Sequence, residues 1–255
     1  MGLSKGALRK TGKVAGFTAL GIVVLLVGEA IYALTRDYPL QDPEQPVQGS
    51  FGDPALPTLR FVVLGDSTSV GVGTTPENSY PWLLATWLSD AYHVELQVVG
   101  IGGATTADLA DMQVEQALAL EPDLVLVEIG ANDTTHGTPL RRVESKIAEA
   151  LDRLRESGAA LVVAGPPNMG TSPVMPQPLR MISGWRGAAV GRRIEEQARK
   201  RDIPYIDLAG GTRDEFVNDP EKYYSTDWFH PGAGGYRLWA EVMYPTVRKA
   251  ADSLG

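Results

Sequence analysis

The 255-residue sequence contains no cysteine and only three histidines. The absence of cysteine excludes disulfide bonds, thiolate metal sites, iron–sulfur clusters and a cysteine nucleophile. A metal cage built from three histidines would need all of His93, His136 and His230. We therefore expect neither a metal ion nor an organic cofactor.

Positive charge and nucleotide-binding motifs are also scarce. The chain has 23 Lys and Arg against 31 Asp and Glu, for a net charge of −8, which argues against a nucleic-acid-binding surface. No Gly-x-x-x-x-Gly-Lys-Ser/Thr loop is present, and Gly100-x-Gly102-Gly103 lacks the remaining features of a dinucleotide site. There is no Gly-x-Ser-x-Gly elbow, which counts against the α/β-hydrolase arrangement.

One long apolar run is present near the N-terminus. Residues 14–34 form a 21-residue stretch whose single charge is Glu29, long enough to cross a bilayer as a helix. The basic residues Lys5, Arg9, Lys10 and Lys13 precede it, so we expect residues 1–13 to be cytoplasmic and the rest to lie outside the cell membrane. The run exceeds the usual length of a signal peptide, which favours an uncleaved signal anchor over a secreted form cleaved after Ala30.

A proline-rich segment follows this run. Residues 35–58 contain five prolines together with glycine and serine, so neither a helix nor an inner strand is expected there. We interpret residues 35–58 as a semi-extended linker and residues 59–255 as one catalytic-sized domain.

Short apolar segments alternate with amphipathic ones in that domain. Strands are expected at residues 59–64, 94–99, 124–129, 160–164 and 204–208, and helices near residues 80–89, 106–120, 139–157, 182–200 and 233–251. This alternation predicts an α/β fold with a five-stranded parallel sheet covered by helices on both faces. In such sheets ligands bind beyond the carboxyl ends of the strands.

The predicted strand ends carry polar and glycine residues. Ser67 follows the first strand, Gly103 the second and Asn132 the third, and the Asp227-x-x-His230 pair precedes the last helix. Each feature alone is compatible with ordinary turn or capping chemistry. Their common position at one edge of the sheet favours a functional site.

In order and spacing these residues resemble the four motif blocks of the SGNH (GDSL) hydrolases. The resemblance rests on Gly65-Asp66-Ser67, Gly103, Gly130-x-Asn132-Asp133 and Asp227-x-x-His230, and it spans about residues 61–236. It implies a flavodoxin-like three-layer α/β/α fold and ester hydrolysis through a serine. The family often has an asparagine five residues before the second-block glycine, where this sequence has Val98, and residues 166–180 match no substrate motif.

Serine-based ester cleavage assigns a role to each of these residues. Ser67 would be the nucleophile, His230 its base, and Asp227 the group that orients the imidazole. The backbone N–H groups of Ser67 and Gly103 and the side-chain amide of Asn132 would bind the oxyanion. The remaining expectations concern neighbours: Asp66 and Asp133 would brace the site, Trp228 or Phe229 would form a pocket wall, and His136 is expected on an exposed turn.

Three functions therefore remain open from the sequence. The first is a membrane-tethered serine esterase acting on lipid, acyl or O-acetylated cell-envelope esters. The second is an acyl- or acetyltransferase that uses the same site on envelope glycans. The third, a non-catalytic binding domain, is disfavoured because every residue that the mechanism needs is present.

Overall fold

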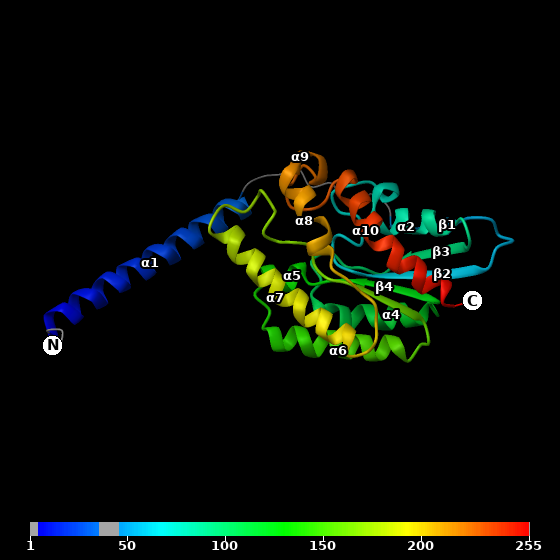
Figure 1. The fold of residues 1–255 in the computed structure, drawn as a ribbon, viewed down its shortest axis with the longest axis horizontal. Helices are drawn as coiled ribbons and strands as arrows, with labels where there is room; N and C mark the ends of the chain where they lie inside the picture. Colours follow the sequence, from blue (N-terminus) through cyan, green and yellow to red (C-terminus); the bar gives the residue numbers. More distant parts are fainter. Residues whose placement is uncertain (1–4, 36–45, 255) are drawn as a thin grey trace.

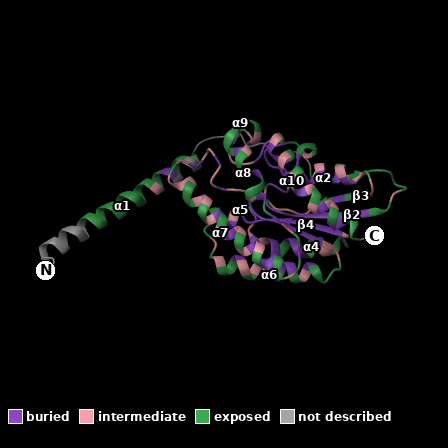
Figure 2. Ribbon diagram, in the orientation of Figure 1, coloured by how far each residue is buried: buried purple, intermediate pink, exposed green. Residues whose placement is uncertain are grey.

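The five apolar segments form the parallel strands of a sheet in the computed structural model, which describes residues 5–35 and 46–254 (Figure 1). The strands are β2 (Thr58–Gly65), β3 (His93–Val98), β4 (Leu124–Glu128), β5 (Ala160–Ala164) and β6 (Tyr205–Ile206), the last being shorter than expected. Every residue of β4 is buried, because helices cover both faces of the sheet (Figure 2).

A sixth strand corrects the prediction of a five-stranded, wholly parallel sheet. Strand β1 (Gln48–Phe51) lies within the predicted linker and pairs antiparallel with β3 at the edge of the sheet, so the sheet is mixed. Val47 is buried, and the ring of Phe51 packs edge-on against Trp82 at 4.9 Å. These contacts attach residues 47–51 to the domain, whereas residues 36–45 of the predicted linker lie outside the described residues.

The strand order positions the functional edge of the sheet. It runs β1-β3-β2-β4-β5-β6, and the five parallel strands follow the 2-1-3-4-5 order of flavodoxin-like folds. The chain turns from β2 to β3 on one side and then to β4 on the other. The connections that follow the adjacent strands β2 and β4 therefore run in opposite directions. Parallel sheets bind their ligands in the crevice between two such connections.

Helices form a layer on each side of the sheet (Figure 1). One layer packs on Phe61 and Val63 and consists of α2 (Tyr80–Leu88), α8 (Leu208–Asn218), α9 (Pro220–Tyr223) and α10 (Ala233–Asp252). The other packs on Val62 and Leu64 and contains α4 (Val114–Ala119), α6 (Leu140–Arg155) and α7 (Leu179–Arg199). Residues of β2 thus alternate between two cores, as the pleat of a strand requires.

Several helical segments differ from the sequence prediction. The predicted helix at residues 106–120 is interrupted, with α3 (Thr106–Asp108), a π-helical turn (Leu109–Gln113) and then α4. The short helices α5 (Ala131–Thr135), α8 and α9 and a 3-10 turn (Pro76–Asn78) were not expected. Of these, α5 and α8 contribute residues to the site described below.

Helix α1 (Lys5–Thr35) contains the apolar run and extends away from the α/β body (Figure 1). Near the C-terminal end of α1, the Glu29 carboxylate accepts a hydrogen bond from the N–H of Leu179 in α7, at 3.1 Å. Within the described residues, no helix combines the length and the hydropathy that a membrane crossing requires. The predicted transmembrane segment at residues 14–34 is therefore not confirmed.

Candidate active site

Ser67 lies in a tight turn directly after β2. The N–H of Ser69 donates to the carbonyl of Asp66 at 3.2 Å, and the N–H of Val72 donates to the carbonyl of Ser67 at 3.0 Å. The next helical element begins only at Pro76, so Ser67 is not a helix cap. Ser67 is half-buried between the buried residues Asp66 and Thr68, which places its hydroxyl at the surface of a rigid turn.

A buried glutamine holds the strand end that precedes this turn. The side chain of Gln113 accepts from the N–H of Gly65 at 2.9 Å and donates to the carbonyl of Gly65 at 2.8 Å. Gln113 belongs to the π-helical turn, a distortion that is frequent near functional sites. The N–H and the carbonyl of Gly65 are thus both hydrogen-bonded, which fixes the position of the backbone just before Ser67.

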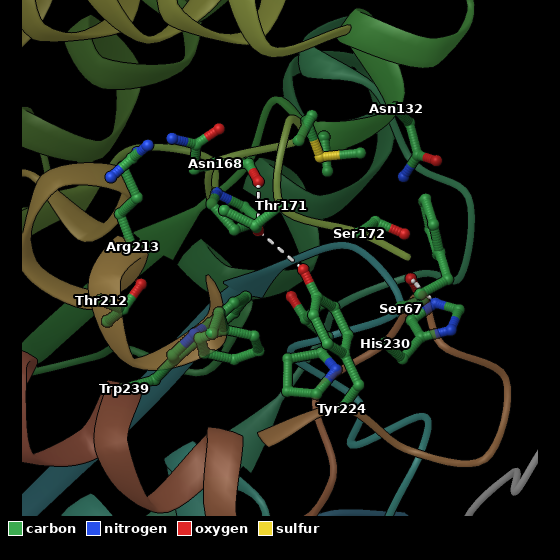
Figure 3. A pocket seen from close by; sticks show the side chains of 17 residues that line it. Ser67, Asn132, Asn168, Thr171, Ser172, Thr212, Arg213, Tyr224, His230 and Trp239 are labelled. Atoms are coloured by element: carbon green, nitrogen blue, oxygen red, sulfur yellow. Dashed lines mark hydrogen bonds between the residues drawn. The ribbon is translucent and has the colours of Figure 1, made fainter. Parts of the chain in front are cut away.

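His230 and Asp227 form a hydrogen-bonded line with Ser67 (Figure 3 shows Ser67 and His230). His230 Nε2 lies 3.0 Å from Ser67 Oγ, and His230 Nδ1 lies 2.5 Å from Asp227 Oδ2. Asp227 Oδ1 accepts from the N–H groups of Phe229 and His230, both at 2.9 Å, and from the hydroxyl of Ser225 at 2.6 Å. Asp227 therefore stabilises the turn that contains His230 and also orients the imidazole ring.

These contacts keep Asp227 ionised. Burial raises the pKa of this carboxyl, but hydrogen bonds from His230, Ser225 and the N–H of Phe229 outweigh burial and lower the pKa to about 2. An anion at this place favours the Nδ1–H tautomer of His230 and stabilises the imidazolium that forms when Nε2 takes a proton.

Donors for an oxyanion come from the turns after β2, β3 and β4. The backbone N–H groups of Ser67 and Gly103 donate to no other protein group within the described residues. Gly103 has φ +79° and open space where a Cβ would lie, so substrate can approach its backbone. The amide Nδ2 of Asn132 donates to the carbonyl of Ala104 at 3.1 Å and faces Asp66 Oδ2 at 3.4 Å.

A glycine and an aspartate place the Asn132 turn. Gly130 has φ +122°, and a Cβ there would approach Ile194 Cδ1 to 2.9 Å, so the turn from β4 into α5 requires glycine. The carboxylate of Asp133 accepts from the N–H and the hydroxyl of Thr106, at 2.8 and 3.0 Å. Asp133 thereby joins the loops after β3 and β4, the bracing role expected for it.

A pocket opens beside Ser67, Asn132 and His230 (Figure 3). Its walls come largely from residues for which no role was expected, and they include Pro167, Asn168, Met169, Thr171, Ser172, Thr212, Arg213, Phe216, Tyr224 and Trp239. Phe229 lines the pocket but Trp228 does not, and His136 is exposed outside it. The spacing of Thr212 and Phe216, one turn apart, is the only sequence pattern that could have indicated the α8 wall.

Among the described residues, no group of three or more histidine, aspartate and glutamate side chains is arranged to hold a metal ion. The site itself holds a hydroxyl, an imidazole and a carboxylate in line, with amide donors beside them. The fold and this arrangement define a serine hydrolase built on a flavodoxin-like sheet.

Comparisons with known proteins identify the family. The model of the GDSL-like lipase/acylhydrolase family matches residues 63–238, and the chain belongs to this family. The SGNH/GDSL resemblance seen in the sequence is thus confirmed, and the protein is a serine ester hydrolase.

The relatives and the solved structures agree with this assignment. The chain is 29% identical over 260 residues to the GDSL-like esterase Rv1075c of Mycobacterium tuberculosis, covering 96% of this chain and 81% of the relative. It is 27% identical to the esterase TesA of Pseudomonas aeruginosa over 194 residues, 74% of this chain and 87% of TesA. A crystal structure of TesA matches with a TM-score of 0.62 at 23% identity, covering 75% of this chain and 99% of that one.

Proposed function

We propose that the protein cleaves carboxylic esters through an acyl-enzyme on Ser67, with His230 as the base and Asp227 as its orienting partner. The observation that carries this proposal is the continuous contact from Ser67 Oγ to His230 Nε2 at 3.0 Å and from His230 Nδ1 to Asp227 at 2.5 Å. A serine hydroxyl is a weak nucleophile until a base within hydrogen-bond reach removes its proton.

The reaction follows from these contacts. His230 Nε2 takes the proton of Ser67 as Oγ bonds to the ester carbonyl carbon, and the resulting oxyanion accepts hydrogen bonds from Ser67 N–H, Gly103 N–H and Asn132 Nδ2. The imidazolium then gives its proton to the leaving alkoxide as the C–O bond breaks. A water molecule, deprotonated by the same nitrogen, attacks the acyl-enzyme and releases the acid and Ser67.

The proposed substrates are acyl or acetyl esters, including those of lipids and envelope glycans. Met169, Phe216, Phe229 and Trp239 give it an apolar surface suited to the acyl part of an ester. Two similar proteins carry names that fit this class: an arylesterase of Vibrio mimicus, 34% identical over 116 residues, and an acetyl-xylooligosaccharide esterase of Geobacillus, with a TM-score of 0.59.

Replacing the nucleophile tests the proposal. With p-nitrophenyl esters from acetate to palmitate, Ser67→Ala is expected to lose turnover on every chain length and to lose labelling by a fluorophosphonate probe. Ser69→Ala is the matched control, because the neighbouring Ser69 hydroxyl donates to the Asp66 carbonyl and lies outside the pocket. Turnover by Ser67→Ala within a few-fold of wild type, with an unchanged fold, would refute the proposal.

We propose in addition that residues 14–34 tether the domain to the outer side of the cytoplasmic membrane. The support is the 21-residue apolar run, the four basic residues before it and the helical conformation of α1. Since Glu29 contacts Leu179, the C-terminal end of the run would lie beside α7 at the membrane surface, and the site would act on esters outside the cytoplasm.

A further inference from the structure

A chain of buried polar groups lies beneath the Ser67 turn and has no part in the proposed reaction. Glu128, the last residue of β4, and Asp66 are both fully buried. The hydroxyl of Thr68 lies between them, 2.5 Å from Glu128 Oε2 and 3.0 Å from Asp66 Oδ1. Two carboxyl groups therefore share one hydroxyl in a site without water access.

Counting protons shows that both carboxyl groups cannot be ionised in this arrangement. An ionised carboxylate only accepts hydrogen bonds, and the Thr68 hydroxyl has a single proton to donate. If it donates to one carboxylate, its oxygen faces the other carboxyl at hydrogen-bond distance. That second contact needs a proton on the carboxyl, because two bare oxygens at 2.5 or 3.0 Å would repel each other in a buried site.

The surroundings of the two carboxyl groups differ sharply. Asp66 Oδ1 also accepts from the N–H of Thr68 at 3.0 Å, and Oδ2 faces Asn132 Nδ2 at 3.4 Å. Glu128 has only the Thr68 contact, because its Oε1 has no partner among the described residues. Hydrogen bonds to the charged form stabilise it, so the negative charge belongs on Asp66 and the proton on Glu128.

Electrostatics point the same way. Burial raises the pKa of Glu128 well above its usual range, and the charge of Asp66 raises it further. Burial also raises the pKa of Asp66 above its usual value, and the two Thr68 hydrogen bonds and nearby His230 offset only part of this rise, whereas Glu128 has a single such hydrogen bond.

We infer that Glu128 holds the proton of the Glu128–Thr68–Asp66 chain, and that ionised Asp66 thereby acts as the positioning residue for the oxyanion-binding amide of Asn132. Glu128 donates to Thr68 Oγ1, and Thr68 donates to Asp66 Oδ1. Asp66 Oδ2 and the Ala104 carbonyl are then both acceptors, so the Asn132 amide must turn Nδ2 and not Oδ1 toward them. Each acceptor takes one Nδ2 proton in the free enzyme, and the proton on the longer contact, to Asp66 Oδ2 at 3.4 Å, is the one that turns to the oxyanion when it forms.

Two isosteric acid-to-amide replacements in the full-length protein test this inference, which rests on the proposed oxyanion role of Asn132. In Asp66→Asn, the two Thr68 donors keep the amide oxygen at the position of Oδ1. The new NH₂ group then takes the position of Oδ2, where it faces the NH₂ of Asn132 and forces that amide to turn away. We expect kcat to fall about 100- to 1000-fold with little change in KM. Glu128→Gln replaces the protonated carboxyl with an amide, which is also neutral and also donates a hydrogen bond. Its kcat should therefore stay within about threefold of the wild-type value.

A double-mutant cycle separates positioning from a general loss of structure. In an Asn132→Ala background, Asp66→Asn should lower kcat by less than about threefold further, because the amide that it misplaces is already absent. The inference would be overturned if Asp66→Asn lowered kcat by a similar factor in both backgrounds. It would also be overturned if Asp66→Asn had only a small effect on kcat, or if Glu128→Gln had a large one. If Asn132→Ala alone leaves kcat unchanged, the proposed oxyanion role fails instead.

The proton can also be observed directly, whatever the kinetics show. The carbonyl stretch of a protonated carboxyl should be present in the infrared spectrum of the wild type at neutral pH and absent in Glu128→Gln. Ser67→Ala, which removes no carboxyl, should retain it. Absence of the band from the wild type, or its persistence in Glu128→Gln, would place the proton elsewhere and overturn the inference even if Asp66→Asn fails to fold.

Discussion

At the scale of single residues, Asp227 links the active site to acid stability. Its pKa falls from 3.8 to about 2 in the folded protein, because three donors outweigh its burial. A depressed pKa contributes stability above the unfolded value, and this contribution disappears as the pH falls from about 4 toward 2. A shift of this size corresponds to about 2 kcal/mol.

Asp227→Asn should remove this pH dependence. We expect the difference in unfolding free energy between wild type and variant to be largest above pH 4 and to shrink by about 2 kcal/mol near pH 2. Urea unfolding over a pH series measures it. Asp214→Asn, at an exposed position, serves as the control and should follow the wild type. Parallel curves for wild type and Asp227→Asn would contradict the assignment.

The sequence indicates the residues that react better than those that hold them. Ser67 and Asn132 follow strands and His230 precedes the last helix, all in recognisable spacing, and the structure brings them together at one pocket. Glu128 offered a signal that was not used, a carboxyl inside the otherwise apolar segment LVLVEI. Its partner Thr68 is 60 residues away in the chain, and only the parallel pairing of β2 with β4 brings the two together.

At the scale of elements, β1 should be essential to the stability of the domain. Val47 is 3% exposed, and Phe51 packs on Trp82. A chain that begins at residue 57 lacks both and leaves β3 as an open edge, which should cost about 2–4 kcal/mol relative to a chain that begins at residue 46. Thermal and urea unfolding of the two truncated chains provide the measurement, and equal stabilities would show that β1 is dispensable.

Helix α7 offers a second element-scale prediction, at its N-terminus. The cap position is Pro178, which has no side-chain acceptor, and the N–H of Leu179 donates instead to Glu29 of α1. Glu29→Ala should weaken this end of α7 by about 1 kcal/mol, while Glu29→Gln, which keeps an acceptor oxygen, should lose less. Faster hydrogen exchange at the Leu179 amide in Glu29→Ala is the expected observation, and unchanged exchange would contradict it.

The elements missed by the sequence prediction each have a physical explanation. Strand β1 has only four residues, two of them polar, in a proline-rich segment, and it exists because β3 offers an unpaired edge. Helix α8 is capped by Asp207, whose side chain accepts from Gly210 N at 2.9 Å, but glycines 210 and 211 obscure its helical pattern. Strands with mostly apolar residues, such as β4, were predictable because burial on both faces imposes their composition.

At the scale of the whole molecule, the chain joins an acidic catalytic body to a helix with an apolar run. The net charge of −8 includes the basic residues of the first 13 positions, so the rest of the chain is more acidic still. Such a body gains little from anionic lipid headgroups, and we expect α1 rather than the body surface to keep the enzyme at a membrane.

Protease accessibility in intact cells tests this arrangement. Because Lys5, Arg9, Lys10 and Lys13 precede the apolar run, the N-terminus should stay inside, and added protease should degrade the domain while a tag at the N-terminus survives. Replacing the four basic residues with glutamine is the matched control and should reduce the fraction of the domain that is degraded. A domain that resists protease until the cells are lysed would reverse the orientation. Release into the medium with a new N-terminus near Ile31 would show instead that residues 14–30 act as a cleaved signal.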